Sequence, residues 1–296
     1  MKPGTLFAIL IAILTAVSVS SKAQSIGEYS FHVEVSGTKS TTGKDIILIP
    51  GLSSSGDVWD ATVEKYQKGH TLHVVTLPGF AGVEPIEFGD SFVDKMGDEI
   101  ARYIKDNKID KPVIMGHSLG GFLTLYIASK YPELPSKIIS VDGLPFLGGI
   151  QNPNITAEQA KTMADAQRAA MKNQPQEARE PMMRAILASM ITDPAQQEIA
   201  YQWGLNSDDE TVGQAMYDLN TIDLRGELAN IKTPALVLGA WVAYKQYGVT
   251  RDMTMMNFRA QYQHLDGVQI ELTDTGRHFI MWDDPEFFFA QLDSFL

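Results

Sequence analysis

Short apolar segments alternate along the chain with longer segments in which apolar residues recur at helical spacing. Several of the apolar segments are rich in Val and Ile, and runs of this length predict strands that are buried on both faces. The predicted strands are 29–35, 45–49, 72–77, 113–115, 138–141, 235–238 and 268–272. The predicted helices between them are 57–66, 91–107, 120–131 and 285–295. This alternation predicts an α/β fold with a mostly parallel central sheet flanked by helices.

The pattern changes in residues 143–230, where no segment has the character of a strand. Helical stretches rich in Ala, Gln and Met fill this region and are interrupted by prolines. We therefore predict a core made of residues 24–142 and 231–296, into which residues 143–230 are inserted as an α-helical cap. We expect the cap methionines to pack within the protein, and the alternative is that they line an adaptable apolar pocket.

The N-terminal segment has the organisation of an export signal. Lys2 supplies a positive charge, residues 6–19 are nearly all apolar, and Ser21 and Ala23 are small residues at the expected cleavage positions. The apolar run is shorter than the ~20 residues that a spanning helix needs, which disfavours the alternative of a membrane anchor. We expect residues 1–23 to be a signal peptide cut after Ala23, and the mature protein to be periplasmic or secreted without a membrane attachment.

The chain has 36 acidic and 24 basic residues, which give a formal net charge of −12. Loss of the predicted signal makes the charge more negative, because that segment contains basic residues and no acidic ones. An acidic surface repels nucleic acids and anionic membranes, so neither is an expected partner, although solubility alone also explains the charge. The chain contains no cysteine, which excludes disulfides, cysteine nucleophiles and thiolate metal sites and leaves stability to the core.

Residues 116–121, Gly-His-Ser-Leu-Gly-Gly, contain a G-x-S-x-G sequence between a predicted strand and a predicted helix. In this context the serine occupies a sharp strand-to-helix turn, and the flanking glycines are needed because a Cβ would collide with neighbouring backbone. The turn exposes the hydroxyl of Ser118 and directs the amide of Leu119 toward the position of a developing oxyanion. We predict that Ser118 is a catalytic nucleophile.

A serine hydroxyl needs a general base within hydrogen-bond reach, and histidine is the first candidate. His278 follows the last predicted strand, in a loop that returns to the carboxyl edge of the sheet, and we predict that it is this base. His264 is the main competitor and is expected to be an exposed helix residue, whereas His117 is expected to pack beside the turn. The alternative for His278 is a surface-loop residue without a catalytic role.

These features resemble the α/β-hydrolase family, in the serine hydrolase branch with a helical cap inserted after the family's sixth strand. Three pieces carry the resemblance: Ile49-Pro50-Gly51-Leu52 after the family's third strand, the turn at Ser118, and Arg277-His278-Phe279 near the end. Members form an oxyanion hole from two backbone amides, which by resemblance are those of Leu52 and Leu119. Pro-Gly stands where members usually carry His-Gly, a change that does not matter if only the backbone donates.

The resemblance also implies an acid that orients the histidine. Members usually carry an Asp after the glycine that ends the seventh strand, but residues 239–244 contain no carboxylate. Some members place the acid after the sixth strand, where this chain has Asp142, so we predict that Asp142 completes a Ser-His-Asp triad. The alternatives are that Asp142 only forms a turn, or that Asp223 or Asp252 is the acid.

Aromatic residues stand where they can form the wall of a substrate site. Trp241 and Tyr244 occupy the loop that lacks the usual acid, and Phe146 follows the family's sixth strand. We expect Trp241, Tyr244 and Phe146 to contact the substrate. The alternative is that these side chains seal the cap against the core.

The combined prediction is a serine hydrolase that needs no cofactor or metal and cleaves a small ester-like molecule, a carboxylester or lactone, through an acyl-enzyme. The serine disfavours the dehalogenase and epoxide hydrolase branches of the family, which use an aspartate nucleophile. Aminopeptidase, carbon–carbon bond hydrolase and acyltransferase activities stay open, because the cap and not the triad selects the substrate. A ligand-binding protein with little turnover is the alternative from another class, suggested by the missing carboxylate in residues 239–244.

Overall fold

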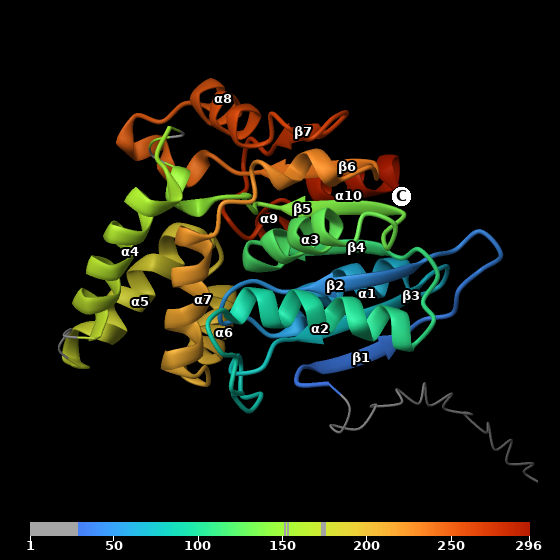
Figure 1. Ribbon diagram of the computed structural model, residues 1–296, viewed down its shortest axis with the longest axis horizontal. Helices are drawn as coiled ribbons and strands as arrows, with labels where there is room; N and C mark the ends of the chain where they lie inside the picture. Colours follow the sequence, from blue (N-terminus) through green and yellow to red (C-terminus); the bar gives the residue numbers. More distant parts are fainter. Residues whose placement is uncertain (1–28, 151, 153, 173–175) are drawn as a thin grey trace, which may run out of the picture.

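The computed structural model describes residues 29–150, 152, 154–172 and 176–296 (Figure 1). The predicted signal peptide, residues 1–23, lies outside the described residues. Within the described part of the chain, no helix combines the length and the apolar character that crossing a bilayer requires.

Among the described residues, seven strands form one sheet in the order β1-β3-β2-β4-β5-β6-β7 (Figure 1). β1 pairs antiparallel with β3, and the other neighbouring strands are parallel. The strands are β1 (His32–Ser36), β2 (Asp45–Ile49), β3 (Thr71–Thr76), β4 (Val113–His117), β5 (Lys137–Val141), β6 (Ala235–Gly239) and β7 (Gln269–Leu272). The predicted mostly parallel sheet is confirmed. The family's third, sixth and seventh strands correspond to β2, β5 and β6.

Helices cover both faces of the sheet (Figure 1). The core helices are α1 (Asp60–Tyr66), α2 (Phe92–Asp106), α3 (Leu119–Lys130), α8 (Arg251–Gln261), α9 (Ile280–Asp283) and α10 (Pro285–Phe295). Each of the four predicted core helices is present, although the first begins with a 3-10 turn, η1 (Gly56–Trp59). The hydrophobic pattern missed α8, because the helix buries only Phe258 and Gln261 and therefore has no apolar stripe along its length.

Alternation along the buried strands divides the core into two layers. All five residues of β2 are buried. Ile47 and Ile49 belong to the layer that contains the buried side chains of α2 and α3, whereas Ile46 and Leu48 belong to the layer that contains those of α10. Because helices cover both faces, the strand is apolar without interruption, as expected for a central parallel strand.

A helical cap is inserted between β5 and β6, as predicted, and its helices gather at one end of the sheet (Figure 1). The cap helices are α4 (Ala157–Lys172), α5 (Gln176–Met190), α6 (Pro194–Leu205) and α7 (Asp209–Thr221). The buried carboxylate of Asp218 joins α7 to the core, since it accepts hydrogen bonds from the Val93 amide at 3.0 Å and the Ser91 hydroxyl at 3.1 Å. Both donors lie at the N-terminus of α2, so a cap residue satisfies a core helix end.

The cap helices keep apolar side chains on the surface. Met163 of α4 is 63% exposed, and Met182 and Ile186 of α5 are also exposed. The expectation that the cap methionines pack is therefore wrong for Met163 and Met182. Met183 does pack, because a Cβ added to Gly204 of α6 would lie 3.1 Å from its sulfur.

Substitution of Gly97 tests the packing of α2 against α3, and Gly213 of α7 is a matched control. A Cβ on Gly97 of α2 would lie 2.4 Å from Cδ1 of Tyr126, whereas an added Cβ on Gly213 of α7 would meet no atom of the described residues within 4 Å. Alanine gains about 1 kcal/mol of helix propensity at both sites, but overpacking costs about 1–3 kcal/mol. We expect Gly97→Ala to lower the free energy of unfolding and Gly213→Ala to raise it by about 0.5–1 kcal/mol in urea titrations. Equal effects of the two substitutions would contradict this packing.

Candidate active site

Ser118 forms the whole connection between β4 and α3. Its backbone has φ 53° and ψ −113°, a strained conformation for a residue with a side chain. The turn is tight: a Cβ on Gly116 would lie 1.9 Å from the carbonyl oxygen of Gly120, and a Cβ on Gly120 would lie 2.1 Å from that of Ile49. The flanking glycines are therefore required by backbone contacts, and the partly exposed serine side chain is presented at the carboxyl edge of the sheet.

Asp142 directly follows β5 and is held on both sides. Its amide donates to the carbonyl of Leu238 at 2.6 Å, and its Oδ1 accepts from the amide of Ala240 at 2.9 Å. Its Oδ2 lies 2.6 Å from Nδ1 of His278. The carboxylate thus joins the loops after β5, β6 and β7, and its remaining oxygen is committed to the histidine.

The loop that carries Asp142 also lies against the turn at Ser118. The Ser118 amide donates to the carbonyl of Val141 at 2.9 Å, and a Cβ on Gly143 would lie 3.0 Å from the Ser118 carbonyl oxygen. The structure therefore brings the predicted serine, acid and histidine to the same edge of the sheet, from β4, β5 and the loop after β7.

His117 packs beside the turn, as predicted, and contacts the His278 loop. The centroids of the two histidine rings are 4.7 Å apart, and Nε2 of His117 lies 3.1 Å from the backbone carbonyl oxygen of His278. A carbonyl only accepts, so Nε2 of His117 donates and Nδ1 carries the lone pair. This contact with the buried His117 supports the backbone of His278.

The loop after β2 approaches the same turn. A Cβ on Gly51 would lie 3.3 Å from Cβ of Ser118, so the backbone that carries Leu52 is close to the serine. Ser54 shapes this loop, because its amide donates to the carbonyl of Gly51 and its hydroxyl to that of Leu52, each at 3.2 Å. The amide of Leu119 opens α3, where the first amides have no acceptor within the helix. Both predicted oxyanion donors therefore belong to backbone beside Ser118.

The three predicted substrate contacts have different surroundings. Tyr244, in the 3-10 helix η4 (Val242–Tyr247), is 46% exposed. Burial, and secondarily the nearby Asp142 carboxylate, raise the pKa of Tyr244. Trp241 is half-buried, and its buried indole nitrogen has no hydrogen-bond partner among the described residues.

Phe146 is fully buried and packs in a small cluster with Ile155 and Ala160. The guanidinium of Arg225 lies 4.7 Å from the centroid of the Phe146 ring. These contacts of the Phe146 side chain all lie within residues 143–230, whereas the side chain of Tyr244 is exposed.

The alternative acids and base lie elsewhere. Asp223 pairs with Arg225, with Oδ2 of Asp223 2.6 Å from Nη2, and Asp252 is exposed in the first turn of α8. His264 is exposed as expected, but it lies in a turn after α8 rather than in the helix. Among the residues that the structure describes, the carboxylate bonded to His278 is that of Asp142.

Tyr262 supports the site without having been singled out in the sequence. Its buried hydroxyl donates to the carbonyl of Gly143 at 2.6 Å and lies 3.3 Å from the hydroxyl of Ser140. Burial raises the pKa of Tyr262, so the phenol stays protonated and able to donate. This bond fixes the loop beyond Asp142. Tyr262 directly follows α8, a helix that the hydrophobic pattern missed.

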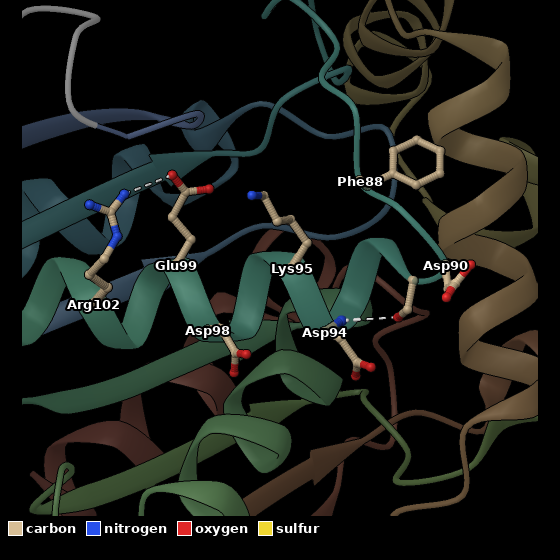
Figure 2. A pocket seen from close by; sticks show the side chains of 8 residues that line it. Phe88, Asp90, Asp94, Lys95, Asp98, Glu99 and Arg102 are labelled. Atoms are coloured by element: carbon tan, nitrogen blue, oxygen red, sulfur yellow. Dashed lines mark hydrogen bonds and ion pairs between the residues drawn. The ribbon is translucent and has the colours of Figure 1, made fainter.

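A surface hollow of about 460 Å³ lies along the outer side of α2 (Figure 2). It is lined by Phe88, Asp90, Ser91, Asp94, Lys95, Asp98, Glu99 and Arg102. Several of these charges are already paired, including Arg102 with Glu99 at 3.2 Å and Asp98 with Lys130 at 2.7 Å. The hollow contains neither Ser118 nor His278, so it is separate from the candidate active site.

A family model described as the alpha/beta hydrolase family matches residues 46–291. The match runs from β2 into α10, and it includes the cap and the loops that carry Ser118, Asp142 and His278. The chain therefore belongs to the alpha/beta hydrolase family, and its fold is the one that the resemblance predicted. Hydrolysis of a small molecule is the activity that membership of this family implies.

Individual relatives include several kinds of hydrolase. A pimeloyl-acyl-carrier-protein methyl ester esterase of Vibrio parahaemolyticus is 35% identical over 103 residues, which cover 35% of this chain and 38% of the relative. RutD of Rhizobium rhizogenes, named as a carbamate hydrolase, is 25% identical over 276 residues, 90% of this chain and 97% of the relative. The solved structure of the enol-lactonase from Burkholderia xenovorans LB400 superposes with a TM-score of 0.71 at 17% identity, covering 90% and 95% of the two chains. The esterase match spans well under half of that relative's length, and the lactonase likeness shows the fold alone.

The buried His117 predicts a pH dependence of stability. Burial, and secondarily the nearby His278, hold the pKa of His117 well below its usual value of 6.5, so the folded state keeps the ring neutral. Below pH 6.5 the unfolded chain binds this proton and the folded state does not, so stability falls as the pH falls, by up to about 1.4 kcal/mol per unit. We expect His117→Gln to lose about 1–2 kcal/mol less stability than wild type between pH 7 and pH 5 in urea titrations. An unchanged pH dependence would contradict a neutral His117.

Proposed function

We propose that the chain is a serine hydrolase that cleaves small ester-like substrates, carboxylesters or lactones, through an acyl-enzyme on Ser118. The observation that carries the proposal is the 2.6 Å contact between Asp142 and Nδ1 of His278, beside the strained turn that presents the serine. A histidine that donates from Nδ1 to a carboxylate has Nε2 as its basic nitrogen. That arrangement is the one a serine nucleophile requires.

In the proposed reaction, Oγ of Ser118 attacks the substrate carbonyl carbon while Nε2 of His278 takes the hydroxyl proton. Asp142 stabilises the resulting imidazolium, and the amides of Leu52 and Leu119 hold the tetrahedral oxyanion. Collapse of the intermediate breaks the acyl–oxygen bond, and His278 returns the proton to the departing alcohol. Water then attacks the acyl-enzyme by the same steps, which releases the acid and restores Ser118.

The substrate class follows from the relatives and from the rim of the site. The named activities of an esterase, a carbamate hydrolase and a lactonase share attack on an acyl carbon that bears a heteroatom leaving group. The exposed Tyr244 and the half-buried Trp241 both belong to the segment after β6, whose first residue, Ala240, donates its amide to Asp142. These aromatic side chains favour a substrate with an apolar part.

The ligand-binding alternative was motivated by the absence of a carboxylate after β6. The contact between Asp142 and His278 supports the hydrolase instead, because a carboxylate after β5 contacts the histidine in place of the usual carboxylate after β6. A protein that only bound its ligand would have no requirement for this pair. Turnover measurements separate the two functions.

The first test of the proposed function is ester turnover by wild type and by Ser118→Ala, with short-chain p-nitrophenyl esters and small lactones as substrates. Loss of the nucleophile removes the acyl-enzyme route, so we expect kcat to fall by at least about a thousandfold. Thermal unfolding of both proteins checks that the variant is folded. Equal rates for the two proteins would refute the assignment of Ser118.

The second test separates Asp142 from the alternative acids. Asp142→Asn keeps the size of the side chain but permits the wrong histidine tautomer, so we expect kcat to fall by about 10³–10⁴-fold. Asp223→Asn and Asp252→Asn are matched controls, because neither carboxylate is bonded to the His278 ring, and both should keep kcat within about threefold. If kcat fell strongly in one of the controls while Asp142→Asn stayed active, the acid of the triad would be the residue substituted in that control.

A further inference from the structure

The loop that carries His278 is hydrogen-bonded to the cap on both sides of the histidine. Nη1 of Arg277 donates to the carbonyls of Ala188 and Ile191, the latter at 3.2 Å. The amide of Phe279 donates to the carbonyl of Met190 at 3.3 Å. These carbonyls lie at the C-terminal end of α5, where the last carbonyls of a helix have no partner within it. The cap helix end and the His278 loop therefore satisfy each other.

One carboxylate completes this contact. Asp283, the last residue of α9, accepts from the amide of Thr192 at 2.8 Å through Oδ1 and from the amide of Arg277 at 2.9 Å through Oδ2. Thr192 belongs to the cap, two residues after the end of α5, and Arg277 directly precedes the histidine. Both oxygens of Asp283 are thus used to hold the cap and the His278 loop at a fixed separation.

Aromatic packing extends the same contact. Trp203 of the cap helix α6 lies 5.5 Å from Trp282 of α9, and Trp282 stacks on Phe279 at 5.0 Å. Phe279 in turn contacts the ring of His117 at 4.6 Å. A continuous row of rings therefore runs from the cap to His117, the residue next to Ser118.

We propose that Asp283 is a positioning residue, which couples the docking of the cap helix α5 to the placement of the His278 imidazole. The inference rests on the proposed function, since it concerns the base of that reaction. Asp283 bonds to the backbone of the residue before His278 and does not touch the imidazole. Its loss is expected to leave substrate binding largely intact and to misplace the base, and misplacement by about 1 Å can lower a rate about a hundredfold.

The test compares Asp283→Asn with Asp218→Asn. Each substitution keeps the side-chain size and weakens one carboxylate bridge between cap and core, but the Asp218 bridge ends on α2, away from the His278 loop. In Asp283→Asn a side-chain NH2 group, which only donates, replaces one carboxylate oxygen and faces a backbone N–H. One of the two hydrogen bonds is therefore lost. We expect kcat for p-nitrophenyl esters to fall about tenfold to a hundredfold with KM changed less than threefold. Asp218→Asn should lower the melting temperature while kcat stays within threefold.

Amide hydrogen exchange supplies a readout that does not depend on turnover. We expect faster exchange at Thr192 and Arg277 in Asp283→Asn and wild-type exchange at these amides in Asp218→Asn. Equal kcat losses in the two variants, or unchanged exchange at Thr192 and Arg277, would overturn the proposal for Asp283. Wild-type turnover by Ser118→Ala would instead overturn the proposed function, so the two failures are distinguishable.

Discussion

The contact between Asp142 and His278 is the interaction on which the proposed site depends. It joins residues 136 positions apart, and it forms only when β5, β6 and β7 lie side by side. The second oxygen of Asp142 accepts from the amide of Ala240 after β6, so one carboxylate ties together the ends of three adjacent strands. The order of the sheet and the orientation of the histidine are therefore parts of the same structure.

Ser118 and Asp142, which directly follow the adjacent strands β4 and β5, both have a positive backbone φ. Ser118 has φ 53° and Asp142 has φ 48°, conformations that cost of order 1–3 kcal/mol each in a residue with a side chain. The sheet holds both, because the Ser118 amide bonds to the carbonyl of Val141 and the Asp142 amide to that of Leu238. Each strained residue thus continues the hydrogen bonding between neighbouring strands. The stability of the sheet offsets the free-energy cost of the two strained conformations.

Local sequence patterns were sufficient for the strands, the helical cap and the turn at Ser118, because each is encoded by neighbouring residues. The contact of Asp142 with His278 was predictable only through the family resemblance, since nothing local links the two positions. The helix α8 was missed because it buries so few side chains. The hydrogen bonds from Tyr262 to Gly143 and from Arg277 to the end of α5 are accepted by backbone carbonyls. Every residue has such a carbonyl, so the sequence does not show which residue accepts.

An acid placed after β5 changes what the loop after β6 must provide. In the proposed site that loop contributes the backbone amide of Ala240, which any residue other than proline can supply. None of the side chains that follow, including those of Trp241 and Tyr244, then has to be the carboxylate that orients the histidine. Substitutions in the loop after β6 can therefore change substrate specificity without changing the proposed triad, which favours the evolution of new specificities.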